Sequence, residues 1–76
     1  NFNYIIKIAD FYFEDSANTF KKRLQNNHNI SNIKVKKMSE NSYRVYKGPF
    51  YNLESIKSDY SDIIKLNFEN IEIEKL

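Results

Sequence analysis

The sequence has no cysteine, and it has only one glycine, one proline and one histidine among its 76 residues. Without cysteine, neither a disulfide scaffold nor a thiolate metal site is possible, and the redox state of the compartment stays open. The histidine, His28, lies in an asparagine-rich segment with no carboxylate partner in helical register. We interpret it as a solvated loop residue and not as a metal ligand, and no cofactor is indicated.

Long apolar runs are also missing, since no stretch approaches the roughly 18 residues that would cross a membrane. The chain is long enough for one domain with a small core and too short for a deep cavity. It begins without methionine and without an apolar leader. We therefore expect a module of a longer protein, monomeric as an isolated domain.

The most informative feature that is present is an internal repeat. Residues 4–16 and 43–55 agree at four positions when one segment is shifted by 39 residues onto the other. The identical pairs are Tyr4/Tyr43, Phe11/Phe50, Tyr12/Tyr51 and Ser16/Ser55. A strand, a sharp turn and a helix start therefore occur twice, which predicts two βαβ halves.

Residue periodicity assigns the individual elements. Residues 4–9, 33–36, 43–47 and 71–74 alternate in polarity or are rich in β-branched side chains, and we predict strands there. Apolar residues three and four positions apart predict one helix that is N-capped by Asp15 or Ser16 and ends at about residue 25, and another from Leu53 to about residue 65. Gly48 and Pro49 end the third strand, because proline has no N–H for the ladder.

The resulting order βαββαβ predicts an α+β domain of ferredoxin-like type. Right-handed crossovers place the four strands in one antiparallel sheet, with the first and third strands central and both helices on one face. The predicted core between the sheet and the helices consists of Ile6, Ile8, Ala17, Phe20, Leu24, Ile33, Val35, Tyr43, Val45, Ile56, Ile63, Ile71 and Ile73.

The other face of this sheet is expected to be open. Strand alternation assigns to it a set of cations, one aromatic ring and one aliphatic side chain. These candidate ligand-binding residues are Ile5, Lys7, Lys34, Lys36, Arg44 and Tyr46. Such a face fits an extended anionic or sugar-rich polymer, whose charges would meet the cations while Tyr46 stacks on a ring. An ordinary solvated face of an antiparallel sheet also carries lysine and arginine.

Residues 43–50 resemble the central signature of SPOR domains, the sporulation-related repeat, in which an aromatic-Arg-Val-x-x-Gly-Pro-Phe segment precedes the second helix. Residues 4–11 resemble that family's first strand, and the likeness covers almost the whole chain. Arg44 matches the family pattern. Lys7 stands where the family usually has glutamine, and Ala9-Asp10 replaces its Gly-Ser pair. We expect Asp10 to cap the following turn.

The resemblance implies binding of bacterial cell-wall peptidoglycan, in particular glycan strands without stem peptides, which are enriched at the division septum. It also implies a periplasmic or cell-envelope parent protein active in cell division, in which such a module is often fused to a wall-cleaving enzyme resembling rare lipoprotein A. Removal of the peptide frees a carboxylate on each N-acetylmuramic acid. Lysine and arginine on the open face would favour the stripped strand, with about 0.2 to 1 kcal/mol for each exposed pair.

Three other readings remain. RNA-recognition domains share the βαββαβ layout, so an RNA or single-stranded nucleic-acid module is the main alternative, although residues 42–47 match its third-strand signature poorly. A small regulatory or structural ferredoxin-like domain is another. An enzyme is disfavoured, because neither a Ser-His-Asp set nor a glycine-rich phosphate loop is present.

Overall fold

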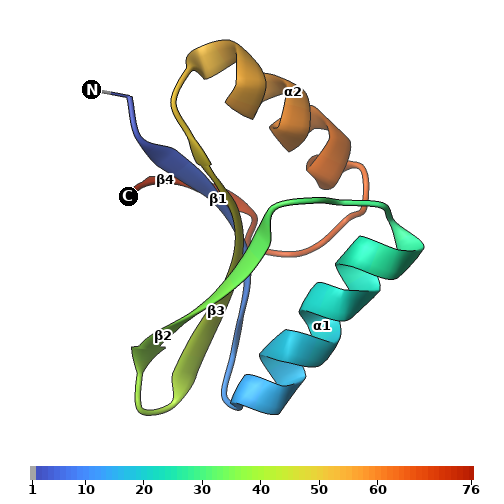
Figure 1. The fold of residues 1–76 in the computed structure, drawn as a ribbon, viewed down its shortest axis with the longest axis vertical. Coiled ribbons are helices and arrows are strands. Elements are labelled where there is room, and N and C mark those ends of the chain that lie inside the picture. The colour runs from blue at the N-terminus through green and yellow to red at the C-terminus, as the bar shows by residue number, and fades with distance from the viewer. Residues whose placement is uncertain (1) are drawn as a thin grey trace.

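Six elements follow one another along the chain in the order βαββαβ (Figure 1). The computed structural model describes residues 2–76. The elements are β1 (Tyr4–Phe11), α1 (Glu14–Asn27), β2 (Ile33–Ser39), β3 (Ser42–Phe50), α2 (Leu53–Ile64) and β4 (Glu72–Lys75). No helix among residues 2–76 combines the length and the apolar character that crossing a membrane requires.

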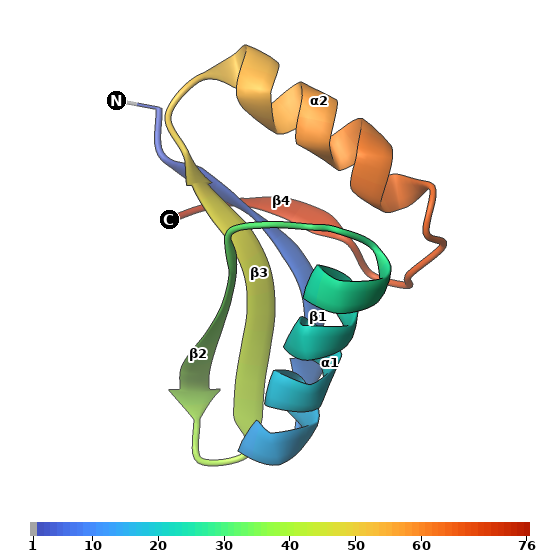
Figure 2. The ribbon, with the colours of Figure 1, turned by 45° about the vertical axis from the view of Figure 1, so that its right-hand side comes forward.

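The four strands form one antiparallel sheet in the order β2-β3-β1-β4. Both helices pack against the same face of this sheet and leave the opposite face uncovered (Figure 2). The predicted architecture is confirmed, including the central position of the first and third strands. The helix-covered face therefore holds the core, and the opposite face is called the open face from here on.

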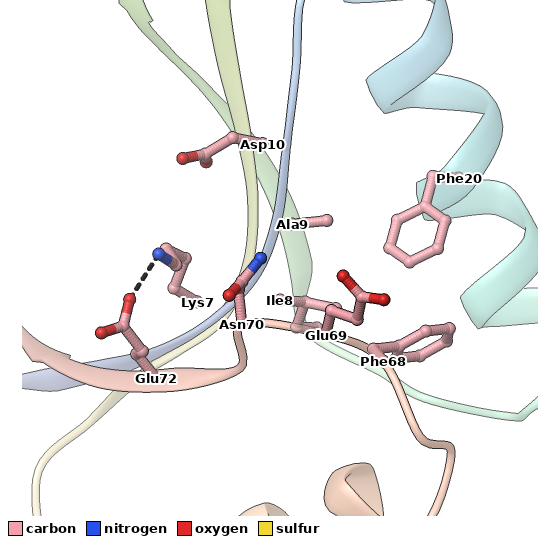
Figure 3. Close-up of a pocket in the computed structure, with 9 residues that line it drawn as sticks. All are labelled: Lys7, Ile8, Ala9, Asp10, Phe20, Phe68, Glu69, Asn70 and Glu72. Carbon is pink, nitrogen blue, oxygen red and sulfur yellow. Dashed lines mark hydrogen bonds and ion pairs between the residues drawn. The ribbon is translucent and has the colours of Figure 1, made fainter.

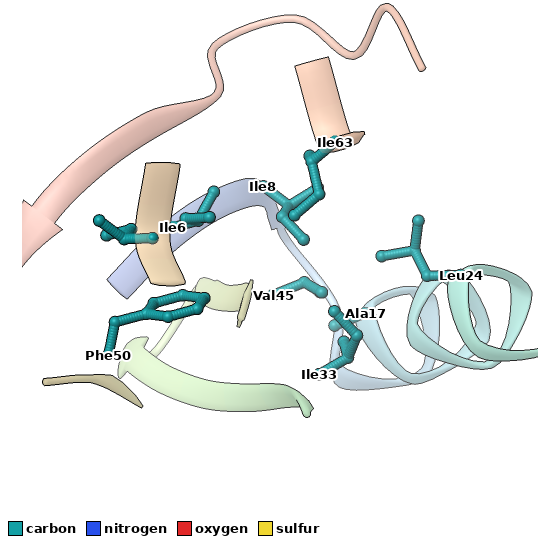
Figure 4. Close-up of a cluster of buried hydrophobic side chains, with 9 residues drawn as sticks. Ile6, Ile8, Ala17, Leu24, Ile33, Val45, Phe50 and Ile63 are labelled. Atoms are coloured by element: carbon teal, nitrogen blue, oxygen red, sulfur yellow. The ribbon is translucent and has the colours of Figure 1, made fainter. Parts of the chain in front are cut away.

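The core is a cluster of nine buried side chains from the sheet and both helices (Figure 4). They are Ile6, Ile8, Ala17, Leu24, Ile33, Val45, Phe50, Ile56 and Ile63. Eight of the nine were predicted, and Phe50 was missed. Phe20, Val35, Tyr43 and Ile71 pack against the cluster while partly buried. Ile73 stays 44% exposed, because it lies on the short edge strand β4.

Two irregularities in the pairing of β1 with β3 explain where the alternation prediction fails. Lys7 pairs with Tyr46 and Ala9 with Val45, so Ile8 is an extra residue and β1 bulges there. A bulge shifts the side-chain alternation by one residue. Strict alternation would turn Asp10 toward the helices, whereas beyond the bulge Asp10 pairs with Arg44 on the open face.

The second irregularity lies in β3 at Gly48-Pro49, which does not end the strand as predicted. Tyr4 pairs with Phe50 and Ile6 with Lys47, so β3 has the extra residue here, and Phe50 turns into the core. Gly48 has φ +137°, and a Cβ there would lie 3.3 Å from Ile5 Cγ2. Only glycine adopts this conformation at low cost.

Lys47 is a buried lysine on the helix-covered face, 7% exposed. Its Nζ donates a hydrogen bond to the carbonyl oxygen of Ser31 and lies 3.7 Å from Asp59 Oδ2 on α2. The buried ammonium group thus has an acceptor and a counter-charge, which burial of a cation requires. Sequence periodicity gave no sign of this role.

The helix starts differ from the prediction in one case. α1 begins at Glu14, with Phe13 at the N-cap and without a side-chain capping bond, so Asp15 and Ser16 lie inside its first turn. The acidic side chains there are favourable beside the positive end of the helix dipole. α2 begins at Leu53 as predicted, and Asn52 Oδ1 caps it by accepting from the Ser55 N–H at 2.9 Å.

Candidate functional site

The six predicted binding residues are all brought together on the open face by the strand register. Directly opposed residues of neighbouring strands share a face and form rows across the sheet. One row runs Lys36, Arg44, Asp10, a second runs Lys34, Tyr46, Lys7, Glu72, and a third contains Ile5 and Glu74. Three carboxylates therefore lie among the predicted cations.

Arg44 is held by two carboxylates from two other strands. Its Nε lies 2.9 Å from Asp10 Oδ1 and its Nη2 lies 3.0 Å from Asp10 Oδ2, a two-pronged contact. Its Nη1 donates to Glu74 Oε1 at 2.9 Å. The hydrogen bond from Arg44 holds the pKa of Asp10 below its ordinary value, and burial opposes this. The guanidinium is thus fixed in one orientation by bidentate, charge-assisted bonds.

Lys7 is also paired within the sheet. Its Nζ lies 2.5 Å from Glu72 Oε1, which Figure 3 marks with a dashed line, and 3.9 Å from Glu74 Oε2. The hydrogen bond from Lys7 lowers the pKa of Glu72. The charge of Lys7 is therefore balanced by the two carboxylates of β4.

The charge of the open face differs from the prediction. Four cations in the rows meet three carboxylates, a balance of +1. The prediction that Asp10 caps the turn is wrong, because the β1 bulge aims its carboxylate at Arg44. Within residues 2–76 no ion pair is found for Lys34 or Lys36, and both are exposed. Within the cross-strand rows, these two lysines of β2 are the cations free to meet a ligand.

A shallow hollow of about 140 Å³ lies on the open face around Tyr46. Its lining residues are Ile5, Lys36, Met38, Arg44, Tyr46, Glu74, Lys75 and Leu76. Ile5, predicted as a contact residue, is only 6% exposed and offers little surface. Met38 and Leu76 are 44% and 55% exposed and were missed. Continuing the alternation of β2 from Lys34 and Lys36 by one step would have found Met38.

This arrangement combines apolar surface with fixed polar groups. Tyr46 and the apolar side chains supply a small hydrophobic surface, and the Arg44 guanidinium and the Glu74 carboxylate at its margin supply donors and acceptors. Among the described residues no group of three histidine, aspartate or glutamate side chains is placed to hold a metal ion. The face thus offers an aromatic ring, hydrogen-bond donors and hydrogen-bond acceptors to a ligand.

No protein-family model matches this sequence, and searches among curated proteins and among solved structures find no match either. What is established is a βαββαβ domain with a four-stranded antiparallel sheet.

Proposed function

We propose that this domain binds glycan strands of bacterial peptidoglycan, preferring strands without stem peptides, and so directs its parent protein to the division septum in the cell envelope. The observation that carries the proposal is the hollow on the open face, in which Tyr46 lies beside the fixed Arg44–Glu74 pair. The resemblance of residues 4–11 and 43–50 to SPOR domains supports it independently.

A sugar ring suits this hollow because it has an apolar face and a rim of hydroxyl groups. Tyr46 offers a flat aromatic surface for that face. Hydroxyl groups both donate and accept, so they bind to Arg44 and Glu74 together without needing a net charge on the protein. Because ion pairs already orient Arg44, little side-chain entropy is lost when a ligand binds.

A preference for stripped glycan rests on Lys34 and Lys36 in this proposal. The lactyl carboxylate freed on each N-acetylmuramic acid meets these unpaired ammonium groups along β2, whereas Lys7 and Arg44 are engaged with Asp10, Glu72 and Glu74. Each exposed pair contributes about 0.2 to 1 kcal/mol. The preference is therefore modest per repeat and grows along the strand.

The face suits nucleic acid less well than glycan. Binding of single strands relies on several stacked aromatic rings and on a strongly positive groove. Tyr46 is the one aromatic residue in the cross-strand rows, and Asp10, Glu72 and Glu74 lie where phosphates would pass. These carboxylates favour the glycan over the RNA alternative.

Co-sedimentation with purified sacculi tests the proposal. We expect the domain to pellet with sacculi, more after amidase treatment, and Tyr46→Ala to lower the affinity about five- to tenfold through loss of ring contact. Tyr12→Ala is the matched control, because Tyr12 is 69% exposed in the turn between β1 and α1. An equal loss of affinity for sacculi in both variants, or no pelleting of the unaltered domain, would reject a glycan site on the open face. Salt-sensitive RNA binding without sacculus binding would instead favour the nucleic-acid module.

A further inference from the structure

β4 covers only half of its neighbour in the sheet. β1 extends from Tyr4 to Phe11, but β4 pairs with Tyr4 to Lys7 alone, so residues 8–11 have a strand partner only on the β3 side. No backbone hydrogen bond outside the helices and the sheet involves Ala9, Asp10 or Phe11 among the described residues. We call residues 8–11 the uncovered edge.

A hollow of about 540 Å³ opens directly beside the uncovered edge (Figure 3). Figure 3 shows Lys7, Asp10 and Glu72 on one side of β1 and the rings of Phe20 and Phe68 on the other. The two rings pack together with centroids 5.2 Å apart. The hollow is therefore polar toward the open face, and toward the helices it holds the two rings with the Glu69 carboxylate beside Phe68. An added strand would meet these two different sides.

The charge around this edge is negative. Four carboxylates and two cations lie near it, which gives a net charge of −2: Asp10, Glu69, Glu72 and Glu74 against Lys7 and Arg44. The opposite edge of the sheet, strand β2, carries Lys34, Lys36 and Lys37. The two edges of the sheet thus differ in sign, and the uncovered edge attracts a basic partner.

We infer that the uncovered edge of β1 accepts an extended peptide of another protein as an added strand, with lysine or arginine alternating with apolar residues. Successive side chains of a strand point to opposite faces, so the apolar ones meet Phe20 and Phe68 while the basic ones lie beside Asp10 and Glu72. These two carboxylates already pair with Arg44 and Lys7, so it is the net negative charge around the edge that attracts the basic side chains. Main-chain hydrogen bonds to residues 8–11 supply the affinity, as in other strand additions. This inference is independent of the proposed glycan binding.

A second copy of the domain is a poorer occupant than a separate peptide. β2 of a second copy has the required alternation. Joining β2 of one copy to β1 of the next would be head-to-tail, however, and such contacts generate open-ended chains.

Titration of the ¹⁵N-labelled domain with an acetylated and amidated pentapeptide of alternating valine and lysine tests the inference. We expect amide shift changes and slowed hydrogen exchange in residues 8–11, and no binding of the same peptide with all of its backbone nitrogens methylated. A valine–glutamate pentapeptide should bind at least about threefold more weakly, as should the valine–lysine peptide to Glu69→Lys. Glu40→Lys is the matched control, because Glu40 is exposed in the β2–β3 turn.

Several results would overturn the inference. One is that millimolar peptide changes no amide chemical shift. The others are chemical-shift changes confined to the open face around Tyr46, and binding of the peptide whose backbone nitrogens are methylated. Self-association of the domain alone through the amides of residues 8–11, seen by analytical ultracentrifugation, would assign the edge to a second copy instead.

Discussion

Lys7 and Tyr46 lie directly opposite each other on the two central strands, and they are also equivalent residues of the two sequence repeats, 39 positions apart. A residue that pairs with its own repeat equivalent marks the axis of an internal two-fold arrangement. The bulges obey the same relationship, since Ala9 and Gly48 are equivalent and each lies at a register shift. The halves match in backbone and differ in the side chains that they present on the open face.

Removal of the Arg44 guanidinium should weaken the sheet. Arg44→Ala deletes charge-assisted bonds that link β3 to β1 and β4, and we expect the free energy of unfolding to fall by about 1 to 2 kcal/mol. Urea titration of Arg44→Ala, Asp10→Ala and the double variant should give a coupling energy of about 1 kcal/mol. Lys37→Ala removes an exposed pair with Glu40 and should cost less than about 0.5 kcal/mol. Additive effects of the Arg44 and Asp10 changes would contradict this role.

Acid should destabilise the domain through Asp10. Its folded-state pKa lies below the ordinary value of 3.8, mainly because of the hydrogen bond from Arg44. A carboxyl group whose pKa is lower in the folded state adds stability above its unfolded pKa and loses it as the pH falls through the folded pKa. The free energy of unfolding should therefore decrease below about pH 4, and Asp10→Asn should flatten that decrease.

Carbon-detected NMR titration of the Asp10 carboxyl group checks the sign directly. The lowered pKa of Glu72 acts in the same direction, with Lys7 as its main cause. Arg44→Ala should return the Asp10 pKa toward its ordinary value. Titration of Asp10 at or above 3.8 in the unaltered domain would show that the pair with Arg44 is not formed in solution.

Most of the fold follows from local periodicity, because apolar residues recur at every second position in a half-buried strand and at every third or fourth position in a helix. The alternation Ile33-Lys34-Val35-Lys36 predicts a strand with one apolar and one basic face, and the register confirms it. Nearly all core residues are found in the same way. The six predicted face residues also lie on one face, because alternation holds from Ile5 to Lys7 and from Arg44 to Tyr46.

The bulges were not predictable from periodicity, and the wrong assignments of Asp10 and Phe50 trace to them. One extra residue in β1 sends Asp10 to the open face, and one in β3 sends Phe50 to the core. Asp10 then neutralises part of the predicted cationic surface. Glu72 and Glu74 lie beside Lys7 because β4 pairs with β1 in the sheet. The residue pattern within one strand does not show which strand is its neighbour.

Gly48 should tolerate no side chain. Gly48→Ala places a Cβ 3.3 Å from Ile5 Cγ2 and from the Tyr4 carbonyl oxygen, at a φ of +137° that alanine rarely adopts. We expect the free energy of unfolding to fall by about 1 to 3 kcal/mol, measured by urea titration. Ser58→Ala, an exposed position of α2, is the control and should change stability by less than about 0.5 kcal/mol. A neutral Gly48→Ala would mean that the β3 bulge relaxes without cost.

If the open face binds glycan as proposed, affinity and charge preference should separate onto different residues. Lys34→Ala with Lys36→Ala removes the two unpaired cations of the cross-strand rows, so the salt dependence and the preference for amidase-treated sacculi should both diminish. Tyr46→Ala should instead lower binding to treated and untreated sacculi by the same factor, because ring stacking carries no charge. Sedimentation at about 50 and 300 mM salt measures both effects. A lysine double variant that keeps the full preference would place the recognition of the stripped strand on Arg44 or Lys7, which would then have to leave their carboxylate partners to reach the ligand.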